Sequence, residues 1–314
     1  MPTELEESGG AIVRSQGLSV SVGRTDAIGR SALEHRANAW RSVIGSMPAP
    51  EVLEWIIGIR RPPPAASAEA AAQVASLVAA IDIERKPARS VPVLAPRKDW
   101  IVSGYRTFER QEAIWLRKFA FQGKAFERVS ELARSICGGL VRPGETRWDP
   151  AQPRHRSCWG VAPLQGERNP PLPPGARSLT SEERQREILQ ASAAPGLSRH
   201  HWGTDFDLFD ADLDPASWER GGRFWPAYVA LRDEGADYGL ADPFRGNGSS
   251  NAGYIQERWH WSYWPIGRGL LEFARANEMK LQRALEARWS LRPQFTLVRQ
   301  RWRDYLFGVG EGKS

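Results

Sequence analysis

Two short stretches about fifty residues apart hold most of the reactive side chains of this chain. The first, SRHHWGTDFD, spans residues 198–207 and contains His200 and Asp207, and the second, ERWHW, spans residues 257–261 and contains His260. A catalytic zinc ion usually takes three protein ligands from His and carboxylate groups and leaves a fourth position for water. His200, Asp207 and His260 match that count, so the fold has to bring the two stretches together around one metal ion.

Glu257 precedes His260 by three residues. On an extended segment, side chains three apart leave opposite faces, so a local bend is needed to bring both to one metal ion. We therefore predict that Glu257 is the general base of a hydrolase and not a fourth ligand.

The end of the first stretch alternates acidic and apolar residues over positions 205–208. This alternation predicts a half-buried strand with both carboxylates on one face. The pattern leaves open whether Asp205 or Asp207 binds the metal. Gly203 lies between the ligands, where the missing side chain permits a tight bend.

A third stretch, SGYRTFERQ, occupies residues 103–111. The three stretches together resemble the VanY-type D-alanyl-D-alanine carboxypeptidases, whose pattern is SxHxxGxxxD followed downstream by ExxH, commonly ExWH, and preceded by an SGYRSxxxQ block. Every position of the ligand pattern is present, and the resemblance covers roughly residues 100–264. It favours Asp207 over Asp205 as the ligand, although Asp205 stands where many relatives have a small residue.

The resemblance implies an α+β fold of the Hedgehog/DD-peptidase kind, in which a small antiparallel sheet with flanking helices carries the zinc site. It implies Zn²⁺ as the cofactor and peptidoglycan stem peptides as the partner, with removal of the terminal D-Ala as the reaction. Two alternatives stay open, a peptidoglycan endopeptidase of the same fold and a noncatalytic zinc-stabilised binding module that has lost its base. The presence of Glu257 argues against the second.

Arg106 follows a strand expected at residues 100–103, where a side chain can be presented to a cleft. Its planar guanidinium suits an oxyanion and a carboxylate equally. We predict that Arg106 is catalytic and either stabilises the oxyanion of the tetrahedral intermediate or binds the substrate carboxylate. By the resemblance, Ser198 and Gln111 hold the peptide, and Tyr105 is a further contact.

Composition narrows the class of partner. Lys and Arg number 43 against 37 Asp and Glu, and the net charge of +6 favours an anionic partner. The basic residues are dispersed and no nucleic-acid fold signature is present, so we predict no nucleic-acid partner. No run of about 18 apolar residues occurs, which predicts no transmembrane segment.

Two further features bear on the surroundings of the protein. The first thirty residues lack the basic start and apolar stretch of a signal peptide, which predicts a cytoplasmic location. The resemblance implies instead that the protein acts at the cell envelope. Cys137 and Cys158 are the two cysteines, and the sequence leaves open whether they pair. For His201, the sequence leaves open whether the side chain makes a contact near the site or lies on the surface. Trp259, Trp261 and Trp264 are predicted to pack in the core.

The chain divides into four predicted parts. They are a disordered segment at 1–30, a helical annex at 31–90, a zinc peptidase domain at 91–268 with an insertion at about 127–178, and a C-terminal helical extension at 269–314.

Local signals predict individual elements within these parts. They are a helix capped by Ser31, a helix opened by Pro50 at Glu51, a helix at 65–83, a helix capped by Thr107 and running to about Phe126, a long loop or lid at 138–177, a helix opened by the capping box Thr180–Glu183, a helix at 224–234 closed by Gly235, a strand-like segment at 254–261, and helices from Gly269 that include a basic amphipathic tail through Trp302.

Overall fold

The computed structural model describes residues 13–15, 18–22, 29–85, 101–209, 215–244 and 254–308. The α-helices are α1 (Arg30–Ser46), α2 (Ala49–Ile56), α3 (Pro64–Ala80), α4 (Phe108–Phe119), α5 (Glu131–Ile136), α6 (Pro153–Trp159), α7 (Ser181–Ile188), α8 (Trp225–Glu234), α9 (Trp264–Ala276), α10 (Glu278–Trp289) and α11 (Thr296–Leu306). The strands are β1 (Val13–Ser15), β2 (Leu18–Val22), β3 (Ile81–Arg85), β4 (Ile101–Ser103), β5 (Phe126–Arg128), β6 (Arg147–Trp148), β7 (Asp205–Leu208), β8 (Leu240–Ala241) and β9 (His260–Tyr263). Short 3-10 helices are η1 (Arg199–Trp202), η2 (Pro215–Trp218), η3 (Gly235–Tyr238) and η4 (Pro293–Phe295).

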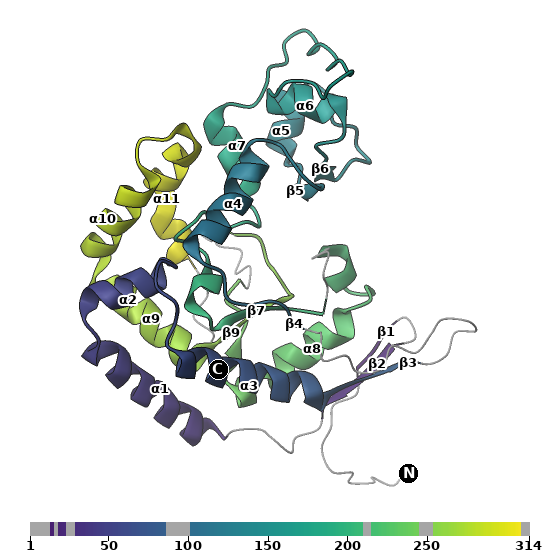
Figure 1. The fold of residues 1–314 in the computed structure, drawn as a ribbon. Helices are drawn as coiled ribbons and strands as arrows, with labels where there is room; N and C mark the ends of the chain where they lie inside the picture. Colours follow the sequence, from purple (N-terminus) through teal and green to yellow (C-terminus); the bar gives the residue numbers. More distant parts are fainter. Residues whose placement is uncertain are drawn as a thin grey trace, which may run out of the picture.

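A four-stranded antiparallel sheet in the order β4-β7-β9-β8 lies at the centre of the fold. Helices surround it, and Figure 1 shows α1, α2 and α9 on one side of the molecule and α8 on the other. The α+β fold class expected from the sequence is therefore confirmed. The prediction of a half-buried β7 was wrong, because every residue of β7 and β9 is buried. They are the two inner strands of the sheet, so little of their side-chain surface is exposed to water.

The first three helices pack directly on the central part of the molecule. α1 lies along α9, and α2 contacts η1 and α9 (Figure 1). α1 begins earlier than the expected Ser31 cap because the carbonyl oxygen of Gly29 already accepts the N–H groups of Ala32 and Leu33. α2 begins at Ala49 after Pro48 rather than at Glu51.

A second sheet, in the order β1-β2-β3, lies outside the central one. β3 starts at Ile81 and pairs antiparallel with β2, so the helix expected up to residue 83 ends at Ala80. This pairing joins segments far apart in sequence, which local propensity does not report. β1 and β2 lie within the segment expected to be disordered, and the other residues before Gly29 lie outside the described residues.

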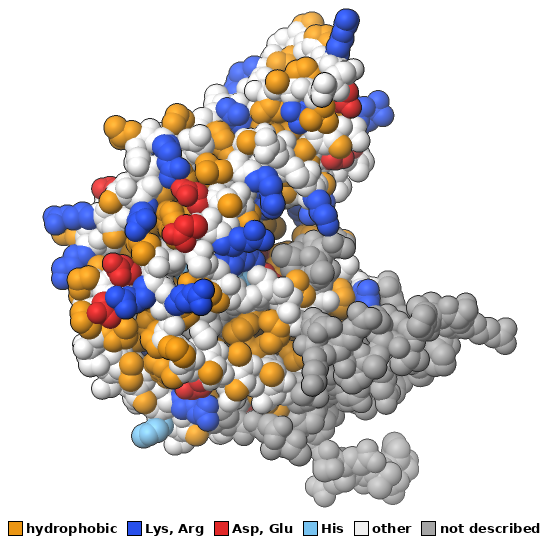
Figure 2. Space-filling model, viewed as in Figure 1, with side chains coloured by type: hydrophobic (Ala, Val, Ile, Leu, Met, Phe, Trp, Pro, Cys, Tyr) orange, Lys and Arg blue, Asp and Glu red, His pale blue; other side chains and the backbone are white. Residues whose placement is uncertain are grey.

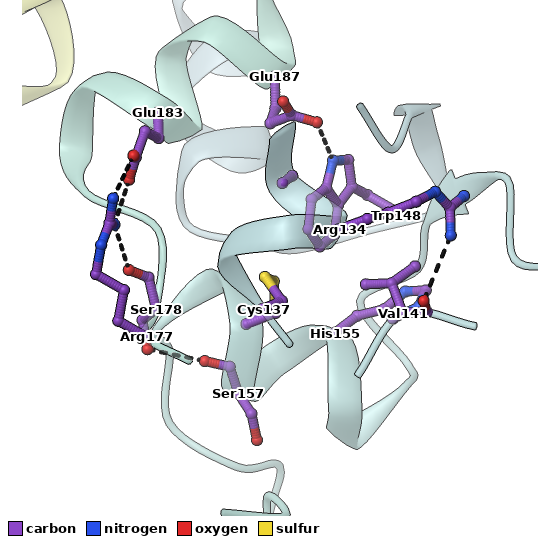
Figure 3. Close-up of a disulfide and its surroundings, with 12 residues drawn as sticks. Arg134, Cys137, Val141, Trp148, His155, Ser157, Arg177, Ser178, Glu183 and Glu187 are labelled. Atoms are coloured by element: carbon purple, nitrogen blue, oxygen red, sulfur yellow. Dashed lines mark hydrogen bonds and ion pairs between the residues drawn. A yellow bond between two sulfur atoms is a disulfide. The ribbon is translucent and has the colours of Figure 1, made fainter. Parts of the chain in front are cut away.

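In the insertion, β6 and α6 lie within residues 138–177, where a long loop was expected. β5 and β6 form a two-stranded ribbon, α5 lies between these strands in the sequence, and α6 follows β6. Cys137 is disulfide-bonded to Cys158 with their Cα atoms 5.4 Å apart (Figure 3). In Figure 1 this unit projects from the top of the molecule, away from α3 and α8. Its own aromatic core and the disulfide explain why a Pro- and Gly-rich sequence is ordered here.

α4 begins as predicted and ends early. The Thr107 side chain accepts the N–H of Arg110 and caps the first turn. The helix ends at Phe119 and not near Phe126, because Phe121 takes a left-handed backbone with a φ of 56°. That reversal brings Phe121 and Phe126 together with ring centroids 5.6 Å apart.

The described part of the C-terminal extension, residues 269–308, is mostly helical as expected. α9 starts at Trp264 and continues through Gly269, and α11 buries Trp302. The strand-like segment expected at 254–261 is shorter in the structure, where β9 begins only at His260. Within the described residues, no helix combines the length and hydrophobicity that a membrane crossing needs.

Candidate active site

The sheet and one 3-10 turn bring the three predicted ligands together. His200 lies in η1, and Asp207 on β7 is directly opposite His260 on β9 in the antiparallel register. His200 Nε2 is 3.2 Å from Asp207 Oδ2, and His260 Nδ1 is 3.1 Å from Asp207 Oδ1. Two ligand atoms of one tetrahedral zinc ion stand about 3.3 Å apart, so these separations suit a shared ion. All three side chains are buried.

The outer nitrogen of each histidine already has a partner. His200 Nδ1 lies 3.2 Å from the backbone oxygen of Asp205, and His260 Nε2 lies 3.1 Å from the Asp205 carboxylate. Histidines that bind metals usually hold their second nitrogen in this way, which directs the free nitrogen toward the ion. In both rings the remaining nitrogen faces Asp207, so the donor set fits a zinc-type ion.

Asp205 lies on the outer side of this group. It is fully buried, and its carboxylate accepts hydrogen bonds from Arg199 at 2.8 Å and from the Thr204 hydroxyl at 2.6 Å. Burial raises the pKa of Asp205, but Arg199 and His260 outweigh burial and hold that pKa at about 2. The structure thus gives Asp205 a supporting contact with His260, whereas Asp207 contacts both histidines.

The charge on the histidines depends on these carboxylates. Burial disfavours a charged His260 ring, but hydrogen bonds to Asp205 and Asp207 raise its pKa to about 9. Burial lowers the pKa of His200, and Asp207 only partly opposes that effect. A cation that binds here therefore has to displace the proton of His260.

Gly203 provides the bend between His200 and Asp207. Its φ is +71°, a left-handed conformation that residues with a Cβ rarely adopt. A Cβ at this position would also lie 2.7 Å from the Pro62 ring and 2.7 Å from the Ser67 hydroxyl at the start of α3. Conformation and space therefore both require glycine at this position.

Glu257 reaches the same place by a turn. The His260 N–H donates to the Glu257 carbonyl oxygen at 3.0 Å, which folds the segment back, and Glu257 Oε2 lies 3.9 Å from His260 Nδ1. Burial and the nearby charge of Asp207 raise the pKa of Glu257 to about 8. The bend that the spacing of these residues required is present, and it places a carboxyl group beside the three candidate ligands.

Arg106 points its guanidinium at this group from the end of β4. Its Nη2 lies 3.2 Å from Asp207 Oδ2 and donates to the Ser103 hydroxyl at 2.7 Å, while its Nη1 donates to the Gln111 side-chain oxygen at 3.2 Å. Gln111 is buried, and its amide nitrogen donates to the Ala193 carbonyl oxygen at 2.7 Å. Both ends of the Gln111 amide thus have a partner, and its oxygen holds Arg106.

His201 is fully buried, which excludes surface placement. Its Nε2 accepts the Gly196 N–H at 3.0 Å, so its Nδ1 carries the proton and donates to the Arg106 carbonyl oxygen at 2.7 Å. Burial lowers the pKa of His201 to about 4, and the ring is neutral near pH 7. His201 thus fixes the backbone of Arg106 from behind.

A cleft of about 1080 Å³ opens over the site and is lined by Arg106, His200, Asp207, Glu257 and His260. Ser198 and Tyr105, the other predicted peptide contacts, also line it. The Tyr105 hydroxyl has no hydrogen-bond partner among the described residues, and burial raises its pKa. The predicted tryptophans Trp259 and Trp261 are buried, and Trp264 is partly buried against the core.

Three supporting residues were missed from sequence. Ser103 orients Arg106, and Arg199 and Ser262 hold Asp205. Ser103 lies inside the SGYR block, so its position beside Arg106 was a usable signal. The pairing of Ser262 with Asp205 depends on the β7–β9 register and has no counterpart in local sequence.

Comparison with known proteins gives three findings. The family model described as VanY, D-alanyl-D-alanine carboxypeptidase, matches residues 95–266. A protein of Haemophilus influenzae described as uncharacterized is 38% identical over 78 residues, which covers 22% of this chain and 59% of that protein. A solved structure of the LdcB LD-carboxypeptidase superposes with a TM-score of 0.32 at 14% identity, over 86% of this chain and 92% of the other.

Proposed function

This chain belongs to the VanY family of D-alanyl-D-alanine carboxypeptidases, and we propose from that premise that it is a zinc-dependent hydrolase that removes the terminal D-Ala from peptidoglycan stem peptides. The observation that carries the proposal is the meeting of His200, Asp207 and His260 beside Glu257 on the floor of one cleft.

Each residue then has a distinct task. His200, Asp207 and His260 would hold the metal ion, and a bound ion would supply the Lewis-acid chemistry that activates water and polarises a carbonyl group. The positive charge of a bound ion would lower the pKa of Glu257 from about 8, so that its carboxylate could accept the proton of the attacking water and return it to the leaving amine. Arg106 stabilises the oxyanion, because its guanidinium already lies beside Asp207.

The contacts also divide the peptide-binding residues from the positioning residues. Ser198 and Tyr105 line the cleft and are proposed to contact the peptide. Gln111 was predicted to contact the peptide as well. Because the Gln111 amide is already hydrogen-bonded to Arg106 and Ala193, we assign Gln111 the role of positioning Arg106.

The direct test is mass spectrometry of a muropeptide ending in D-Ala-D-Ala after incubation with the zinc-loaded chain. Loss of a single D-Ala supports the proposal. Release of a larger fragment would identify an endopeptidase, and stoichiometric zinc without any cleavage would identify a binding module. EDTA treatment followed by zinc addition has to abolish and restore the activity.

A further inference from the structure

The cleft does not end at the candidate metal centre. It continues along α4 to the β5–β6 ribbon of the insertion, where its walls carry five Arg and Lys residues in addition to Lys118. We call this part of the cleft the basic arm, and its residues are Arg110, Arg117, Lys124, Arg128 and Arg147. Figure 2 shows Lys and Arg side chains gathered around the hollow below the insertion.

The basic arm lacks the acidic partners that other cations of this protein have. Within the described part of the chain, none of its five side chains forms an ion pair with a carboxylate. By contrast, Lys118 in the same cleft pairs with Glu127, and outside the cleft Arg177 pairs with Glu183. The positive charge of the arm is therefore not neutralised from within.

Two of these cations lie on neighbouring strands of the ribbon. Arg128 on β5 and Arg147 on β6 are cross-strand partners at an irregularity of the antiparallel register, and both line the cleft. Arg147 Nη2 donates to the Ala125 carbonyl oxygen at 3.4 Å, neither guanidinium group has an anionic partner among the described residues, and like charges on cross-strand neighbours repel each other. A carboxylate placed between them would accept hydrogen bonds from both guanidinium groups and remove the repulsion.

The ribbon is held in place independently of any ligand. Trp148, next to Arg147, donates its indole N–H to Glu187 on α7 at 3.0 Å (Figure 3). The same carboxylate accepts the Ser130 N–H just beyond β5 at 3.0 Å. The arginine pair is thus fixed at the edge of the cleft by contacts with the body of the protein.

We propose that the basic arm binds the carboxylates of an acidic peptide whose C-terminal end lies at the candidate metal centre. The preferred substrate on this account carries two or more free carboxylates in addition to the one at its C-terminus. This inference rests on the proposed peptidase function for the orientation of the peptide, and on the unpaired cations for its charge.

Two peptides of equal length, each with an uncharged dye and a D-Ala-D-Ala end, test the proposal. One carries two Glu residues upstream and the other carries Gln in their place. Binding is measured by fluorescence anisotropy to the full chain bearing Glu257→Gln, so that neither peptide is cut. We expect the acidic peptide to bind more tightly than the neutral one. In the triple variant Arg117→Gln, Lys124→Gln, Arg128→Gln, the affinity for the acidic peptide should fall about tenfold, and the affinity for the neutral peptide should not change.

The matched control removes three exposed cations that lie outside the cleft. Arg168→Gln, Lys280→Gln and Arg283→Gln change the net charge by the same amount, and the acidic peptide should bind this variant as it binds the parent. The three substituted residues of the arm are also exposed, so both triple variants should keep the parent's thermal midpoint. Added salt should lower the affinity of the parent for the acidic peptide and should have little effect on the affinity of the arm variant.

Three results would overturn the inference: equal affinity of the parent for both peptides, an equal loss in the control variant, or binding of inorganic polyphosphate without binding of the acidic peptide. Failure of the proposed peptidase function has a different signature. It would appear as no hydrolysis of either peptide by the zinc-loaded wild-type chain, a result that leaves the binding comparison intact.

Discussion

Trp55 is hydrogen-bonded to Trp202, and a second bond from Trp202 to the residue after Trp55 ties α2 to η1. The Trp55 indole N–H donates to the Trp202 carbonyl oxygen at 3.0 Å, and the Trp202 indole N–H donates to the Ile56 carbonyl oxygen at 3.2 Å. Both rings are fully buried. Through this contact α2, far away in sequence, holds the 3-10 turn that presents His200.

Replacing Trp55 by Phe should therefore affect both stability and metal binding. The change leaves the buried Trp202 carbonyl without its donor, which should cost about 1–3 kcal/mol of unfolding free energy. It should also lower the affinity for zinc by up to about tenfold, because residues that hold a metal ligand in place contribute to the affinity for the ion. Denaturant unfolding and zinc competition titrations measure the two effects. Trp159→Phe is the matched control, because its buried indole also donates to a carbonyl oxygen at 3.0 Å but lies in the insertion, so it should change stability alone.

The two carboxylates of β7 should differ in their effect on metal content. Asp207→Asn should leave the site without zinc, because one of the three proposed metal ligands is lost. Asp205→Asn should keep one equivalent of zinc at about 10- to 100-fold lower affinity, because His260 loses its anionic outer partner. Elemental analysis after dialysis against a graded series of chelators separates the cases. A metal-free Asp205→Asn beside a fully loaded Asp207→Asn would reverse the assignment.

Glu257→Gln should bind zinc normally and lose turnover by about two to four orders of magnitude, since an amide of the same shape cannot accept the proton. The measurement is D-Ala release per equivalent of bound zinc. Glu127→Gln is a useful companion, because Glu127 is also a buried carboxylate of the cleft but pairs with Lys118 away from the ligands. Comparable losses in the two variants would mean that Glu257 has no special role.

Arg106→Lys should retain zinc and lower kcat about 100-fold, because one ammonium group cannot contact Ser103, Gln111 and Asp207 together as the guanidinium does. Kinetics on free-acid and C-terminally amidated peptides decide between the two roles considered for Arg106. If the defect lies mainly in KM and shrinks on the amidated peptide, Arg106 binds the substrate carboxylate instead.

Glu183 makes part of the stability depend on pH. The hydrogen-bonded ion pair with Arg177 lowers the pKa of Glu183 to about 2, below its ordinary value of 4.5. Its contribution is therefore full above about pH 4.5 and is lost as the pH falls through about 2. Glu183→Gln keeps the capping geometry and should cost about 1 kcal/mol at pH 7, after allowance for solvent screening, and less at pH 3.5. Denaturant unfolding at both pH values measures this, and a loss that is equally large at pH 3.5 would contradict the role given to the Arg177 pair.

The features foreseen from sequence are those encoded by close neighbours. The Thr180–Glu183 capping box, the Thr107 cap, and the end of α8 at Gly235 depend on residues within one helical turn, and all three are present. The three candidate ligands were picked out because each lies in a motif of recognisable spacing.

The features that were missed depend on partners distant in sequence. α4 ends early because Phe121 turns into an aromatic cluster with Trp159, about forty residues away. The insertion is ordered through Cys137 and Cys158, whose pairing the sequence left open. The support of His260 by Asp205 depends on how β7 and β9 pair, and the alternation of acidic residues could not separate a ligand from its neighbour.

The close approach at Gly203 limits how this protein can be re-engineered. The backbone between His200 and Asp207 has the start of α3 packed against it, with no room for even a methyl group. A chimera that transplants residues 198–207 into another scaffold would leave this surface uncovered unless α2 and α3 moved with it. α2, α3 and residues 198–207 therefore have to be transferred together, although more than a hundred residues separate α3 from residue 198 along the chain.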